Sequence, residues 1–64
     1  MMEIKRELFS ETALTEAIDA FSHLCVITVL ESATGWNLVF ENCKYGCRLT
    51  EKEFENYLIG LENT

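Results

Sequence analysis

Proline is absent from the sequence, and glycine occurs only three times. This scarcity, together with 48% hydrophobic residues, is typical of a folded globular chain and not of a disordered one. Basic residues are also few, since five Lys and Arg stand against eleven Asp and Glu and give a net charge of −6. Binding to a nucleic-acid backbone requires a basic stripe, which is missing. No uncharged stretch approaches the ~20 apolar residues of a membrane-spanning helix.

The length of 64 residues allows one small domain, residues 1–64, and excludes a multidomain enzyme. Residues 1–7 are charged and lack the apolar stretch of a signal peptide, so we expect a cytoplasmic protein with reduced thiols. A domain of this size buries only ~60% of the surface of its unfolded chain, which makes a metal, a disulfide, unusually good packing or a partner subunit a common source of stability.

The first part of the chain predicts a strand followed by a helix. Residues 3–9 alternate loosely and favour a strand. Ser10 is a good helix N-cap, and Phe9 with Leu14 has the spacing of a hydrophobic staple. We therefore expect an amphipathic helix from Glu11 to about residue 23. Its apolar side consists of Leu14, Ala17, Ile18, Phe21 and Leu24.

Two strands joined by a short turn should follow. Residues 25–30 form a β-branched run that is apolar on both faces, which is typical of a central, covered strand. Residues 32–35 have turn chemistry, and residues 36–41 alternate, with Trp36 in phase with the core positions. A turn centred near residues 33–34 would pair residues whose numbers sum to about 67, and would place segment 23–25 beside segment 42–44.

The last part of the chain predicts a second helix. Thr50 with Glu53 fits a capping box, and Leu49 with Phe54 repeats the staple spacing. The loop before it covers residues 42–48, and Gly60 ends this helix or weakens its last turn. The apolar stripe consists of Phe54, Tyr57, Leu58 and Leu61.

These elements predict an α+β fold of order β-α-β-β-α, with two helices packed on one face of a small three-stranded sheet. The strand order cannot be deduced. Two helices cover only one face, so Val26, Leu30 and Val39 should form an apolar surface on the other. We expect this open face, or a strand edge, to bind a partner, and a homodimer is the commonest case. An extended peptide added to a strand edge is a second mode. The alternative is that Val26, Leu30 and Val39 are scattered hydrophobic residues on the surface, which are common and bind nothing.

The cysteines offer a different class of function. His23, Cys25, Cys43 and Cys47 could converge near one end of the hairpin and bind zinc, or act in thiol redox chemistry. Their spacing matches no strong zinc signature, and adjacent strand residues point to opposite faces. The alternative to zinc binding is that Cys25 is a small buried hydrophobic residue and that Cys43 and Cys47 are free thiols in a loop. A Cys43–Cys47 disulfide is sterically possible, but a reducing compartment argues against it.

Catalysis is not indicated by the sequence. His23 is the only histidine, and no serine or carboxylate is placed to form a triad with it. A pocket of ordinary ligand size is hard to build in so short a chain, so we expect neither an enzyme nor a cofactor. Tyr45 lies in a polar loop between two cysteines and is the preferred exposed recognition residue, since large aromatics dominate interfaces.

The stretch Phe-Ser-x-x-Ala-Leu-x-x-Ala-Ile-x-x-Phe at residues 9–21 resembles the HxsD family of His-Xaa-Ser system proteins, as does Phe-x-Asn-Tyr-Leu-Ile at residues 54–59. The resemblance rests on helix stripes and caps. It implies a small accessory protein of a system in which a radical enzyme modifies a ribosomally made peptide. Such a protein would present the peptide or brace the modifying enzyme, and it contributes no catalytic residues.

Overall fold

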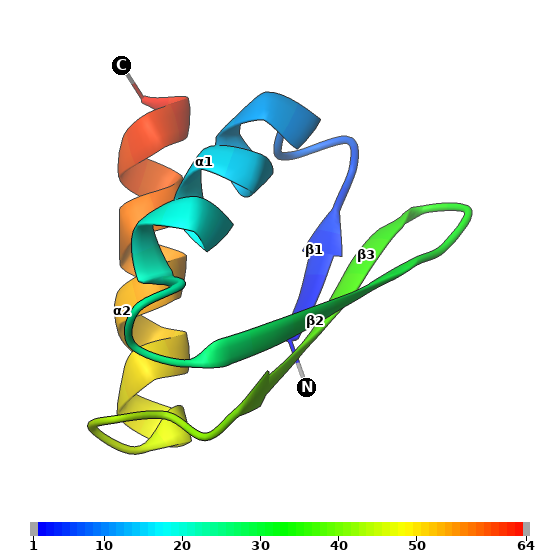
Figure 1. Ribbon diagram of the computed structural model, residues 1–64. Helices are drawn as coiled ribbons and strands as arrows, with labels where there is room; N and C mark the ends of the chain where they lie inside the picture. Colours follow the sequence, from blue (N-terminus) through cyan, green and yellow to red (C-terminus); the bar gives the residue numbers. More distant parts are fainter. Residues whose placement is uncertain (1, 64) are drawn as a thin grey trace.

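A computed structural model describes residues 2–63 (Figure 1). The elements are β1 (Met2–Lys5), α1 (Glu11–Phe21), β2 (Val26–Glu31), β3 (Gly35–Glu41) and α2 (Cys47–Glu62). The predicted α+β order β-α-β-β-α is confirmed. Both helices lie on the same side of the three-stranded sheet, and the N-terminal strand β1 forms one edge of that sheet, beside β3 (Figure 1).

The core lies between the helices and one face of the sheet. Leu38 of β3 and both Phe54 and Leu58 of α2 are fully buried. Phe54 also packs edge to face against two other aromatic rings. Phe54 contacts the rings of Phe21 and Phe40, each with a centroid separation of 5.4 Å. The remaining buried apolar residues are Ile4, Ala13, Leu14, Ala17, Cys25 and Trp36. Trp36 therefore belongs to the core, as its phase predicted.

The strand order is β1-β3-β2, and both ladders are antiparallel. The expectation that residues 25–30 form a central strand is wrong, because β3 occupies the centre and β2 is an edge. The tight turn at residues 33–34 forces β3 against one side of β2, while β1 pairs with the far side of β3. Nothing within residues 2–63 hydrogen-bonds to the other side of β2.

Several predicted boundaries also change. The first strand ends at Lys5, and residues 6–9 form turns in which Leu8 is 65% exposed. The first helix ends at Phe21, two residues earlier than expected, whereas its Ser10 cap is confirmed by a bond from the Ala13 amide, 3.1 Å long.

The second helix begins at Cys47 with Gly46 as N-cap, so Thr50 is not the cap. The Thr50 side chain is buried inside the first turns, where its hydroxyl donates to the Gly46 carbonyl at 2.8 Å. A serine or threonine hydroxyl can donate to a carbonyl one turn back inside a helix as well as cap a helix end. The threonine therefore does not mark the start of this helix, although the sequence predicted that it would. The helix also continues through Gly60 to Glu62.

Candidate protein-binding edge

The free side of β2 exposes large apolar side chains. Val26, Val29 and Leu30 are 52%, 40% and 51% exposed. Val29 points to the face that the helices pack against, but the helices do not reach far enough to cover it. The stretch from Val26 to Leu30 contains no charged residue, proline or glycine, although proteins commonly protect strand edges with such residues.

The backbone groups that point outward from β2 follow from the hairpin. Ser32 donates its amide to the Gly35 carbonyl at 2.8 Å, so these two residues form a hydrogen-bonded pair. Hydrogen-bonded and non-hydrogen-bonded pairs alternate along an antiparallel ladder. Val26, Thr28 and Leu30 therefore direct their amides and carbonyls toward β3. Those of Ile27, Val29 and Glu31 point away from the sheet.

The open face of the sheet carries the three apolar residues that the sequence placed there, together with polar residues. Its register pairs Thr28 with Val39, and the diagonal neighbours of Val39 are Val26 and Leu30. Val39 is half-buried. These three residues form an apolar strip along β2. The rest of this face carries polar and charged residues, namely Glu3, Lys5, Asn37 and Glu41.

Glu31 is the only charged residue of β2, and its charge is already paired. The Arg6 guanidinium donates to the Glu31 carboxylate at 3.0 Å and lies 4.5 Å from the centre of the Trp36 ring. Arg6 thus reaches across the central strand from the end of β1. The free edge of β2 is consequently close to neutral in a chain of charge −6.

The opposite edge of the sheet is a poorer binding site. β1 has four residues, two of which, Glu3 and Lys5, form an ion pair at 3.4 Å. Its end is tied to the hairpin turn because the Arg6 amide donates to the Thr34 carbonyl at 2.8 Å. A short, charged strand is a typical protected edge.

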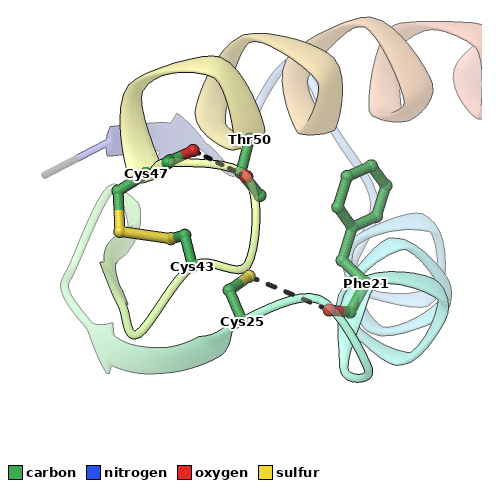
Figure 2. The surroundings of a disulfide bond; sticks show 6 residues. Phe21, Cys25, Cys43, Cys47 and Thr50 are labelled. Carbon is green, nitrogen blue, oxygen red and sulfur yellow. Dashed lines mark hydrogen bonds between the residues drawn. A yellow bond between two sulfur atoms is a disulfide. The ribbon is translucent and has the colours of Figure 1, made fainter.

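Cys43 and Cys47 form a disulfide, so the expectation that both are free thiols is wrong (Figure 2). The loop turns back at residues 44–46 and α2 begins at Cys47, which brings the two Cα atoms to 4.9 Å, within disulfide range. Cys25 is the free, buried cysteine, and its thiol faces the Phe21 carbonyl at 3.8 Å. Burial raises the pKa of the Cys25 thiol.

The four candidate zinc ligands do not form a metal site. The hairpin register does place segment 23–25 beside segment 42–44, since the Lys44 amide donates to the Leu24 carbonyl at 2.7 Å. However, two of the four residues are consumed by the disulfide, and His23 is exposed after α1. Among residues 2–63, no group of three or more His, Cys, Asp or Glu side chains is arranged to bind a metal ion.

Tyr45 lies at the tip of the disulfide loop and is 63% exposed, with the Lys44 ammonium 5.6 Å from the centre of its ring. A shallow hollow of about 720 Å³ runs along α1 and is lined by residues of that helix and its C-cap, including three carboxylates. Within residues 2–63, no helix is long and apolar enough to cross a membrane.

Sequence reasoning selected Val26, Leu30 and Val39 but missed Ile27, Val29 and Glu31, whose backbones form the free edge. The turn at residues 33–34 predicts which residues of β2 and β3 pair, since the paired residue numbers sum to 67. It does not predict which side of β2 stays free, because that depends on where β1 pairs in the sheet. Comparisons with protein-family models, curated proteins and solved structures find no match to this chain.

Proposed function

We propose that this chain is a small, non-catalytic protein-binding module that accepts an extended segment along the free edge of β2. The observation that carries the proposal is the row of outward backbone groups at Ile27, Val29 and Glu31 beside exposed Val26, Val29 and Leu30. Strand addition uses such a row for affinity and adjacent side chains for selectivity. Three residues with one amide and one carbonyl each offer up to six hydrogen bonds.

The surroundings support a protein partner over a small ligand. The edge is exposed and apolar, and the hollow along α1 is open and lined by one helix with its C-cap. Tyr45 is an exposed aromatic on a loop stiffened by the disulfide, and the backbone of Lys44 fixes this loop to the residue preceding Cys25. In the context that the HxsD resemblance implies, the module would be an accessory subunit that holds a peptide substrate or its modifying enzyme.

A synthetic peptide unrelated to this chain tests the proposal. The peptide Lys-Val-Thr-Val-Thr-Val-Lys alternates apolar and polar residues and has no bias toward a natural partner. Added to ¹⁵N-labelled protein at about 20 µM, it should shift the amide signals of Ile27, Val29 and Glu31 and slow their hydrogen exchange. The same peptide with proline at its centre is the matched ligand control, because it cannot extend the ladder.

A variant of the edge separates backbone pairing from side-chain contact. Val29→Pro removes an amide that points away from β3, so the fold should persist while the added strand is blocked. Val29→Thr keeps the amide and nearly the same shape. We expect at least a tenfold loss of peptide affinity for the proline variant only. Absence of any shift at residues 27, 29 and 31 in the wild type would contradict the proposed function.

A further inference from the structure

We propose that the natural occupant of the β2 edge is a second copy of this chain, with two β2 strands paired antiparallel about a two-fold axis at Thr28. This inference rests on the proposed function and names its partner. Two three-stranded sheets would join into one sheet of the order β1-β3-β2-β2-β3-β1. The symmetry is isologous, as in most homodimers.

Hydrogen-bond parity restricts the register. In an antiparallel ladder, outward residues must face outward residues, and those of β2 carry odd numbers: Ile27, Val29 and Glu31. Paired residue numbers between the copies must therefore sum to an even number. Sums of 56 and 58 are the two that use the strand along most of its length. They place the axis at Thr28 or at Val29.

Side-chain chemistry selects the sum of 56. In that register Val26 lies opposite Leu30 of the second copy, and Thr28 lies opposite its own counterpart. Ile27 meets Val29, so the exposed valine on the helix-covered side gains an apolar neighbour. With a sum of 58, Glu31 would face Ile27 and Leu30 would face Thr28. Apolar pairs and threonine pairs stabilise adjacent strands, whereas a carboxylate against isoleucine does not.

Local charge does not oppose a second copy at this edge. Glu31, the only charge of β2, is paired with Arg6 and would lie opposite Cys25 of the second copy and not opposite a second Glu31. The paired strands are therefore uncharged from Val26 to Leu30. The remaining repulsion comes from the net charge of −6 on each chain, which is long-range and screened by salt.

The interface area indicates a weak dimer. A ladder from Val26 to Leu30 is about 15 Å long, so strand pairing alone falls short of the ~800 Å² per partner of a standard interface. We therefore expect a dissociation constant on the order of 100 µM and a dimer that forms only at high concentration. Because salt screens the repulsion between acidic copies, raising NaCl from about 20 mM to about 300 mM should strengthen association several-fold.

Single cysteine variants test the register. Two Thr28 residues would form a non-hydrogen-bonded pair with Cα atoms about 4.5 Å apart, within disulfide range. Under mild oxidation Thr28→Cys should form a covalent dimer on a non-reducing gel. Val29→Cys and Leu30→Cys should form little, since their counterparts lie on diagonals or farther away. Wild type is the background control, because Cys43 and Cys47 are paired and Cys25 is buried. Faster cross-linking at residue 29 or 30 would overturn the Thr28 axis.

Sedimentation of the unmodified protein tests the dimer itself. The mass should rise from 7.4 kDa toward twice that value as concentration increases to about 1 mM, and Val29→Pro should abolish the rise. A monomer at that concentration, or a dimer that Val29→Pro leaves intact, overturns this inference. If the chain stays monomeric but binds the test peptide at residues 27, 29 and 31, the dimer is refuted and the proposed function stands. Absence of the peptide shifts at these residues removes the proposed function itself, whatever the sedimentation result.

Discussion

Glu62 at the end of α2 accepts two hydrogen bonds from Ser10, the N-cap residue of α1. The backbone amide and the hydroxyl of Ser10 donate to the Glu62 carboxylate at 2.8 Å and 2.9 Å, while the same hydroxyl accepts from the Ala13 amide. In an ordinary capping box, a glutamate three residues after the cap bonds the cap amide. Here Ala13 occupies that position, and a glutamate from the other helix performs the same role. The cap therefore also fastens one helix to the other.

Removing this carboxylate should loosen both helices. We expect Glu62→Ala to lower the free energy of unfolding by about 1 kcal/mol, the usual value of a cap, and the melting temperature by roughly 4–8 °C. Glu55→Ala, on the exposed side of the same helix, is the matched control and should change stability little. Thermal unfolding followed by circular dichroism measures both. Ser10→Ala combined with Glu62→Ala should cost less than the sum of the two single changes, because both remove the bond between the Ser10 hydroxyl and the Glu62 carboxylate.

Gly35 lies where the end of β1 approaches β3 too closely for a side chain. A side chain there would overlap the Ile4 carbonyl oxygen and lie 3.0 Å from the Arg6 amide, both backbone atoms that cannot turn aside. We expect Gly35→Ala to destabilise the protein by about 3 kcal/mol by forcing β1 off the sheet. Gly60→Ala is the contrast, because Gly60 is helical with open space around it and should gain about 0.5–1 kcal/mol. Urea unfolding of the two variants should give opposite signs, and equal effects would refute the β1–β3 pairing.

Local patterns predicted most of the fold, and the contacts that failed depend on distant parts of the chain. The cap of α1 and the pairing sum of the hairpin are set by neighbouring residues, and both are confirmed. The predicted stripe of α1 is confirmed at Leu14, Ala17 and Phe21, whereas Leu24 lies beyond the end of the helix. The edge position of β2 was missed because its composition suits a covered strand. Only the docking of β1 on the far side of β3 decides it.

The candidate site divides in the same way. Val26 and Leu30 follow from strand alternation, so the sequence identified them as surface residues. Arg6 and Glu31 are 25 residues apart in the sequence and pair across the width of β3. No local sequence pattern predicts such a long-range ion pair. The disulfide was rejected on the expected compartment and not on geometry. Yet whether two cysteines four residues apart can pair depends on the path of the loop between them, and this loop brings them within bonding distance.

Opening the Cys43–Cys47 disulfide should weaken the fold. A loop of about five residues closed by a disulfide restricts the unfolded chain by roughly 2 kcal/mol at 25 °C. We expect the double variant Cys43→Ser, Cys47→Ser to lose that amount in urea unfolding, and a reductant to produce the same loss in the wild type. The double variant itself should not respond to the reductant. An equal response of wild type and double variant would show that reduction acts elsewhere.

Cys25 should be protected from thiol reagents in the folded protein. Its side chain is 6% exposed, and burial raises the pKa of the thiol because the thiolate is poorly solvated there. The thiolate is the reactive form, so a colorimetric disulfide reagent at pH 8 should label Cys25 only when the chain opens. The labelling rate should rise with urea in step with unfolding. Labelling of the native protein as fast as of an unfolded chain would show that the thiol is accessible.

The same shift makes stability depend on alkaline pH. Below the ordinary thiol pKa of 9.0, folded and unfolded chains both keep the proton, and Cys25 adds no pH dependence. Above it, the unfolded chain releases the proton while the folded chain retains it, so the free energy of unfolding falls until the pH passes the raised pKa. Cys25→Ala removes this contribution but leaves those of the tyrosines and lysines. The difference between wild type and Cys25→Ala in urea midpoints should therefore be constant from pH 7 to about pH 8.5 and change at higher pH in the direction that disfavours the wild type. A constant difference throughout would mean that the thiol titrates normally in the folded state.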